Sequence, residues 1–112
     1  MKKVLFFLFV ACTRQSSQIE VVEKVDFQIL IKQNHELIDV RTPSEFSQGH
    51  IENAINIDIN SPNFKQLLCE MDKNQTILVY CAVGGRSAKA AKVMRSLGFE
   101  KIYDLKGGYG TW

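Results

Sequence analysis

Short apolar runs alternate with segments of helical periodicity over residues 19–112. The apolar runs predict strands at residues 19–22, 36–40, 54–57, 76–80 and 101–103. Apolar positions that recur every three to four residues predict helices at residues 26–33, 42–49, 63–71 and 86–97. Strands that alternate with helices favour an α/β fold, in which a small parallel sheet of about five strands carries helices on both faces.

Some of these predictions concern particular residues of the helices and the burial of one strand. Asp26 is expected to cap the helix at residues 26–33, because a short polar side chain there can accept a free N–H. In the helix at residues 63–71 the apolar spacing places Phe64, Leu67 and Leu68 toward the core, with Cys69 beside them as a small core residue. The apolar strand at residues 76–80 is typical of a strand whose two faces are both covered.

The first residues read as an export signal. Residues 1–12 start with Lys2 and Lys3 and continue as a short apolar run, which is the pattern of a secretory signal peptide. Phe9-Val10-Ala11-Cys12 resembles a bacterial lipobox, in which Cys12 is lipidated, although that pattern prefers Leu where Phe9 stands. Residues 13–18 then form a polar tether. We expect an exported protein, periplasmic or anchored to the membrane by a lipid on Cys12; a buried strand or an uncleaved anchor is the alternative.

Composition and charge narrow the functional classes. The chain has 112 residues, 46% apolar and 23% charged, which fits one globular domain and argues against a disordered chain. Three cysteines are too few for a disulfide scaffold. Without Lys2 and Lys3 the basic and acidic residues balance at 12 each, so no general attraction to nucleic acid is expected. From Arg86 to Trp112 there are 6 basic and 2 acidic residues, which suits a small anionic substrate or, equally, a solvated helix face.

The segment with candidate chemistry begins where the strand at residues 76–80 ends. Cys81 follows this strand directly, and ligand sites of open parallel sheets lie beyond the carboxyl ends of strands. Gly84 and Gly85 permit positive φ angles, which would let backbone amides point inward as an anion-binding nest. The helix that follows adds its free N–H groups, and Arg86 adds a positive charge. These surroundings favour a reactive thiolate; a buried structural thiol is the alternative.

Three segments together resemble the rhodanese-type family. Leu37-Ile38-Asp39-Val40-Arg41-Thr42-Pro43-Ser44-Glu45-Phe46, with Gly49-His50-Ile51 and Ala54-Ile55-Asn56-Ile57, is similar to the family's amino-terminal signature. Cys81-Ala82-Val83-Gly84-Gly85-Arg86-Ser87 resembles its active-site loop, and Leu105-Lys106-Gly107-Gly108-Tyr109 with Trp112 resembles its closing motif. The resemblance covers residues 19–112 and implies a rhodanese-like domain.

The resemblance implies a sulfurtransferase that uses no cofactor and no metal. Cys81 would take the outer sulfur of thiosulfate or a related donor and pass it, as a persulfide, to cyanide or to a small or protein thiol. The loop residues would bind the substrate: Ala82, Val83, Gly84, Gly85, Arg86 and Ser87. A persulfide carrier or sensor without useful turnover is the competing class. Cys81 and Arg86 are separated by four residues, whereas tyrosine and dual-specificity phosphatases use five, so a cysteine phosphatase or arsenate reductase is less favoured.

Some residues of the signature have a structural alternative. Asp39 and Arg41 are candidate supporting residues of the site, or they fix the loop after their strand. Arg41 and Glu45 are four apart and are expected to pair. His50 resembles a packing histidine, and the two histidines offer no metal-ligand spacing. The alternative for Cys69 is a resolving thiol that forms a disulfide with Cys81.

Overall fold

The computed structural model describes residues 18–112 and contains five strands, four α-helices and one 3₁₀ helix over that range. In chain order these are β1 (Gln18–Val22), α2 (Lys24–Ile31), β2 (Glu36–Asp39), α3 (Pro43–Ser47), β3 (Ile55–Asn56), α4 (Phe64–Cys69), β4 (Ile77–Tyr80), α5 (Gly85–Ser96), β5 (Lys101–Leu105) and η1 (Gly108–Thr111). The predicted signal peptide, the lipidation of Cys12 and all but Gln18 of the predicted tether lie outside the described residues. Gln18 itself begins β1.

The five strands form one sheet in the order β1-β5-β4-β2-β3, and every neighbouring pair is parallel. All carboxyl ends therefore meet at one edge. The central strand β4 is buried along its whole length because both its neighbours and both its faces are covered. The predicted parallel sheet of five strands is confirmed.

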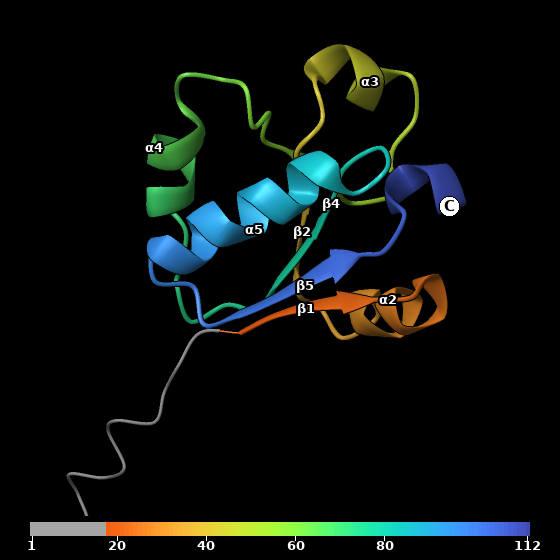
Figure 1. Cartoon of the computed structure of the whole chain (residues 1–112), viewed down its shortest axis with the longest axis horizontal. Helices are drawn as coiled ribbons and strands as arrows, with labels where there is room; N and C mark the ends of the chain where they lie inside the picture. Colours follow the sequence, from red (N-terminus) through yellow and green to blue (C-terminus); the bar gives the residue numbers. More distant parts are fainter. Residues whose placement is uncertain (1–17) are drawn as a thin grey trace, which may run out of the picture.

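Helices cover both faces of this sheet, as predicted (Figure 1). On one face α4 and α5 pack through Phe64, Leu68, Ala90 and Met94 against inward residues of the strands, including Val79 and Ile102. On the other face α2 packs through Phe27 against Leu78, Tyr80 and Leu105. The two cores use alternate residues of the same strands, since successive strand side chains point to opposite faces.

Three side-chain predictions were wrong. Asp26 is not a cap: α2 begins at Lys24 after an extended Glu23, and Asp26 lies in the first turn, where an acid favours the positive end of the helix. Leu67 is 40% exposed, because Phe64 and Leu68, four residues apart, already define the inward side of α4. Cys69 is exposed at the end of the same helix for the same reason.

Candidate active site

The carboxyl edge of the sheet brings together α3, the loop between β4 and α5, and η1 (Figure 1). Cys81 follows β4 directly and is 1% exposed. Its sulfur lies between this loop and the first turn of α5, since its polar neighbours are Gly84 and Ser87. Cys81 therefore lies at the end of a buried strand, as predicted.

One backbone amide of the loop points at the sulfur. The Gly84 N–H donates to Cys81 Sγ at 3.0 Å. Gly84 has φ +120°, a conformation that favours glycine, although a Cβ there would meet no atom within 4 Å. Gly85 does not adopt the positive φ that a glycine permits, because it already belongs to the first turn of α5. The requirement for glycine in this loop is thus conformational and falls on Gly84.

The start of α5 supplies further polar groups around Cys81. The N–H groups of Gly85, Arg86 and Ser87 belong to the first turn, where an α-helix offers them no acceptor, and this end of the helix is electropositive. Ser87 is fully buried, and its Oγ lies 3.4 Å from Cys81 Sγ. The side chain of Val83 is 77% exposed at the mouth of the loop, and Ala82 is half-buried.

Arg86 is held by Glu45, an arrangement that the sequence did not predict. Its two terminal nitrogens donate to Glu45 Oε1 at 2.8 Å and Oε2 at 3.0 Å. These bonds, helped by Thr42, lower the pKa of Glu45 to about 2. Glu45 in turn raises the pKa of Arg86 above its usual value, and the nearby Cys81 adds to the increase. The charge of the Arg86 guanidinium is therefore paired with the Glu45 carboxylate.

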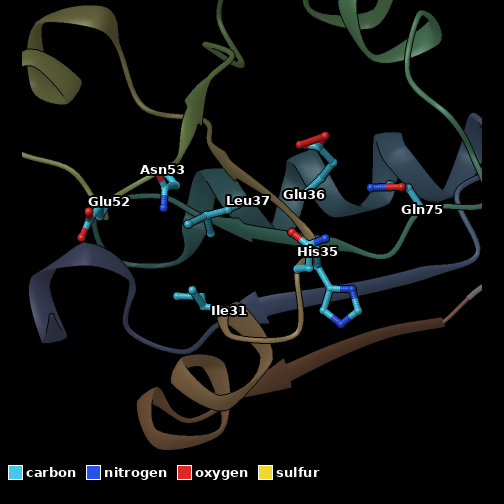
Figure 2. Close-up of a pocket in the computed structure, with 8 residues that line it drawn as sticks. Ile31, His35, Glu36, Leu37, Glu52, Asn53 and Gln75 are labelled. Atoms are coloured by element: carbon cyan, nitrogen blue, oxygen red, sulfur yellow. The ribbon is translucent and has the colours of Figure 1, made fainter.

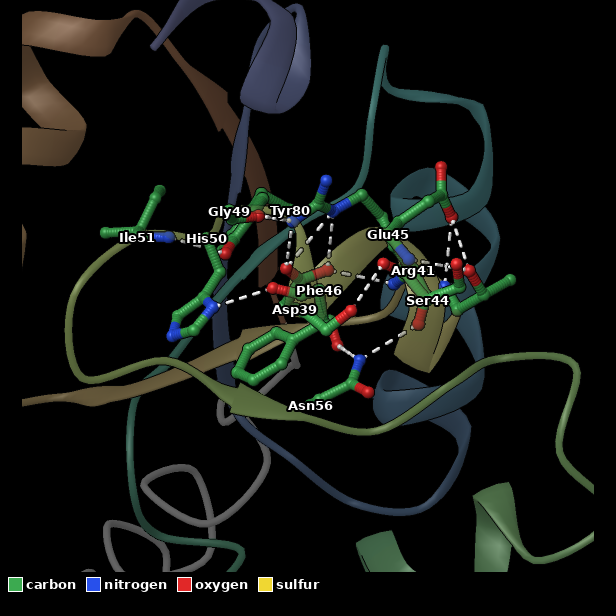
Figure 3. Close-up of polar contacts among 12 residues, drawn as sticks. Asp39, Arg41, Ser44, Glu45, Phe46, Gly49, His50, Ile51, Asn56 and Tyr80 are labelled. Carbon is green, nitrogen blue, oxygen red and sulfur yellow. Dashed lines mark hydrogen bonds and ion pairs between the residues drawn. The ribbon is translucent and has the colours of Figure 1, made fainter.

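Arg41 does not pair with Glu45 as predicted; it pairs with Asp39 (Figure 3). Arg41 Nε and Nη2 donate to the Asp39 carboxylate at 3.0 and 2.7 Å, and Nη2 also donates to Gly49 O at 2.8 Å. The guanidinium lies 4.5 Å from the centroid of the Tyr109 ring. Asp39 is fully buried. These contacts place Asp39 and Arg41 as the support of the loop after β2.

The helix α3 within that loop is stabilised by its own sequence. Thr42 and Glu45 form a reciprocal capping box, in which the Glu45 N–H donates to Thr42 Oγ1 and the Thr42 N–H donates to Glu45 Oε1. His50 Nδ1 contacts Phe46 O at 2.8 Å, and the two rings stack. The capping box fixes Glu45 where it can reach Arg86.

The closing segment holds the Cys81 loop from the other side. The N–H of Tyr109 donates to Cys81 O at 2.7 Å, and that of Gly110 donates to Ala82 O at 3.0 Å. Gly108 has φ +65°, and a Cβ there would come within 2.6 Å of the backbone of Cys81 and Ala82. Only a glycine permits this close approach, so the carboxyl-terminal motif holds the backbone of the Cys81 loop in place.

Asp104 is a site residue that the sequence analysis missed. It lies on β5, is 3% exposed, and accepts a hydrogen bond from Ser87 Oγ at 2.7 Å. Burial raises the pKa of Asp104 to about 6, although the bond from Ser87 opposes the increase. The signal was present in the sequence, because Asp104 alternates with Ile102 on the core-facing side of a strand predicted to end too early, at residue 103.

Other candidate ligands lie apart from Cys81. Among residues 18–112 no three His, Cys, Asp or Glu side chains gather as a metal site requires, and Cys69 and Cys81 are both free thiols. In the same range no helix is both long and apolar enough to cross a membrane.

A cavity of about 430 Å³ is lined by residues that include His35, Glu36, Glu52 and Gln75 (Figure 2). It lies where β2 and β4 begin, at the opposite edge from Cys81.

Comparison with known proteins identifies the family. A model of the rhodanese-like domain matches residues 25–112. Thiosulfate sulfurtransferase 16, chloroplastic, of Arabidopsis thaliana is 38% identical over 93 residues, which cover 74% of this chain and 78% of that protein. Thiosulfate sulfurtransferase GlpE of Shewanella oneidensis is 31% identical over 77 residues, which cover 69% of this chain and 74% of that protein.

A solved structure agrees with these sequence matches. A rhodanese-related protein from Thermoplasma volcanium has a TM-score of 0.73 and 32% identity, and the match covers 83% of this chain and 89% of that one. The resemblance drawn from the three motifs is confirmed, and the chain belongs to the rhodanese-like domain family.

Proposed function

We propose that this protein is a sulfurtransferase that carries sulfane sulfur on Cys81. The single observation that carries the proposal is the buried Cys81 sulfur at the first turn of α5, with the Gly84 N–H directed at it. Hydrogen-bond donors and a helix amino terminus stabilise an anion, and both a thiolate and a persulfide are anions. The names of the relatives, which are thiosulfate sulfurtransferases, support the same chemistry.

The reaction has two displacements. The Cys81 thiolate attacks the outer sulfur of thiosulfate or a related donor, the donor's S–S bond breaks, and sulfite leaves with the bonding electron pair. A cyanide ion or an acceptor thiolate then attacks the terminal sulfur of the persulfide, and Cys81 leaves as the thiolate that began the cycle. The enzyme alternates between two covalent states, so ping-pong kinetics are expected. The preorganised N–H groups of the loop and of the first turn of α5 hold the negative sulfur in both states.

The Arg86–Glu45 pair supports a second candidate, a persulfide carrier that takes sulfur from a protein partner. A dianionic donor has to compete with Glu45 for Arg86, which weakens the attraction of a small anion to the loop. The exposed Val83 leaves the mouth of the loop accessible to a bulky acceptor. Rates distinguish the two candidates, because a carrier accepts sulfur faster from the persulfide of a partner than from thiosulfate.

Phosphoryl transfer is less favoured than sulfur transfer. Four residues separate Cys81 from Arg86, and the sulfur beneath them is buried. A ring of this size accommodates a single terminal sulfur atom more readily than a tetrahedral phosphate. We therefore expect no release of phosphate from an aryl phosphate under conditions in which thiocyanate forms.

The test incubates the protein with thiosulfate and cyanide and measures thiocyanate, with intact mass recording one added sulfur before cyanide is supplied. Cys81→Ser should abolish both signals, while Cys69→Ser, a matched change at the exposed thiol, should leave them intact. Thiocyanate formation by Cys81→Ser would reject the nucleophile. An added sulfur without turnover would favour the carrier.

We also propose export and lipidation of Cys12, and this proposal rests on the sequence of residues 1–12 alone. Labelled palmitate should enter the wild-type chain in a bacterial host and should not enter Cys12→Ser. A wild-type chain that remains unlabelled and unprocessed would reject the proposal.

A further inference from the structure

Asp104 is a buried carboxyl without a compensating charge. It occupies the fourth position of β5 and faces the same side of the sheet as Ile102, under α5. Its partners in register are Val79 on β4 and Val21 on β1, which are both apolar. Of the three ion pairs among residues 18–112, none includes Asp104. A carboxylate in such a place is costly, so its proton is held more tightly than usual.

The charged and titratable groups around Asp104 are few. From α5 the group in contact is Ser87, while Arg86 is turned toward Glu45. From the end of β4 it is Cys81, whose sulfur contacts the Ser87 hydroxyl that binds Asp104. Burial raises the pKa of Asp104, the bond from Ser87 opposes the increase, and no neighbouring charge contributes. The protonation of Asp104 is therefore tied to a single hydroxyl.

Ser87 has one proton to donate and three candidate partners. Its Oγ lies 2.7 Å from Asp104 Oδ1, 3.2 Å from Gly84 O and 3.4 Å from Cys81 Sγ. The shortest of these, to an ionised carboxylate, is the strongest. While Asp104 is ionised, the Ser87 proton points to it, and only the lone pairs of Ser87 face the sulfur. A thiol can donate to those lone pairs, whereas a thiolate or a persulfide sulfur has no proton to donate.

We propose that Asp104 is a positioning residue that decides, through Ser87, whether the sulfur of Cys81 meets a hydrogen-bond acceptor or a donor. An ionised Asp104 holds Ser87 as an acceptor for the thiol. A protonated Asp104 donates to Ser87, which then donates its own proton to the thiolate or to the inner sulfur of the persulfide. The reactive forms of Cys81 and the neutral form of Asp104 thus favour each other.

The change between the two states balances without an outside reagent. The Cys81 thiol proton passes to Ser87 Oγ, and the Ser87 proton passes to Asp104, so that one negative charge moves from the carboxylate to the sulfur. When Cys81 leaves as a thiolate after sulfur transfer, the same protons can return. The two groups share a titration, and a proton bound at one changes the affinity at the other.

The inference rests on the proposed role of Cys81, but its test does not need sulfur transfer. Alkylation of Cys81 by iodoacetamide is followed by mass spectrometry of the Cys81 peptide between pH 5 and 10. Asp104→Asn resembles the protonated carboxyl, so the midpoint of the alkylation profile should move to lower pH. A shift of one pH unit makes alkylation about tenfold faster on the acid side of the midpoint and leaves it unchanged at the alkaline plateau.

A gain of reactivity separates this role from a merely structural one. Loss of a structural contact would slow alkylation or leave the midpoint of its pH profile unchanged, and either result in folded Asp104→Asn would overturn the proposal. Asp26→Asn makes the same chemical change at an exposed position of α2 and should reproduce the wild-type profile. Failure of Cys81→Ser to stop thiocyanate formation rejects the proposed function, whereas an unshifted alkylation profile rejects only this inference.

The route through Ser87 has its own test. In a Ser87→Ala background, Asp104→Asn should shift the alkylation midpoint by much less than it does alone, because the hydroxyl that couples the two groups is missing. An undiminished shift would mean that charge acts directly through space, and would overturn the role of Ser87.

A carbon-13 titration of the Asp104 carboxyl tests the coupling even if Asp104→Asn does not fold, because it follows Asp104 itself. In the wild-type protein the Asp104 signal should show a second, alkaline transition that reports the ionisation of Cys81. That transition should be absent in Cys81→Ser. Identical single transitions in both proteins would overturn the coupling.

Discussion

Two aspartates are buried at the carboxyl edge of the same sheet, and they have opposite surroundings. Asp39 ends β2 and receives a two-nitrogen bond from Arg41 together with the Arg41 backbone N–H. Asp104, on β5, receives one hydroxyl, from Ser87. The charge of Asp39 is compensated by Arg41. The charge of Asp104 is not, and its raised pKa of about 6 puts its ionisation within reach of a modest change in pH.

The comparison predicts its largest effect at Arg41. Arg41→Ala removes the partner of a fully buried carboxylate and leaves its charge unpaired, which destabilises the fold by about 3–5 kcal/mol. Urea unfolding at neutral pH measures the loss. Arg95→Ala removes an exposed arginine of α5 and should cost less than about 1 kcal/mol. Equal losses of stability in the two variants would mean that Arg41 does not compensate the charge of Asp39.

The ion-pair partners of the charged residues could not be predicted from the sequence. The periodic patterns placed the strands, the layers and Cys81 correctly, because side-chain alternation and helical spacing are local properties of the chain. Ion-pair partners depend on how distant loops meet. Arg41 and Glu45 have the spacing of a pair, yet Arg41 turns to Asp39, and Glu45 reaches Arg86, which is 41 residues away.

Boundaries and small geometric details were missed for related reasons. The last strand was expected to end at residue 103, so Asp104 was not recognised as a core-facing strand residue, and its link to Ser87 went unseen. Of the two loop glycines that permit a positive φ, Gly84 adopts one and Gly85 does not, and the sequence does not show where the loop becomes a helix. Cys69 is exposed because Phe64 and Leu68 define the inward side of α4, and the helix ends at Cys69 rather than at residue 71.

The second prediction concerns the uncompensated aspartate. Its pKa is raised from 3.8 to about 6, so the folded state binds a proton that the unfolded state releases between those values, and stability falls as pH rises through them. Asp104→Asn removes this penalty. The variant should be more stable than the wild type by about 3 kcal/mol at pH 7.5, with the difference closing toward pH 4.

Unfolding free energies of both proteins at pH 4.5 and 7.5 measure this difference. Asp26→Asn, the exposed control, should stay within about 0.5 kcal/mol of the wild type at both pH values. A variant that is less stable than the wild type at pH 7.5 would show that the Ser87 bond outweighs the burial of the charge.

The smallest effect on stability is expected at Glu45, which resembles Asp39 in one property. Its charge is compensated, by Arg86, as that of Asp39 is, but it lies at a half-exposed surface where water screens the pair. Glu45→Gln should therefore cost less than about 1 kcal/mol in spite of two short bonds. The pKa of Glu45 is lowered from 4.5 to about 2, so this contribution is complete above about pH 4.5 and is lost as pH falls toward 2.

Glu45→Gln should change the binding of the sulfur donor more than it changes the stability of the fold. Without the Glu45 carboxylate, Arg86 is free to bind a dianion, so we expect the KM for thiosulfate to fall several-fold. The kcat should change little, because Arg86 would contact the donor equally in the ground state and in the transition state. Initial rates against thiosulfate at fixed cyanide measure both constants, with Glu70→Gln, an exposed glutamate after α4, as the matched control. An unchanged KM would mean that Arg86 takes no part in donor binding and that its pair with Glu45 only fixes α3 against the loop. A protein that draws sulfur from a partner would show that result, so the measurement also bears on which of the two candidate functions the chain performs.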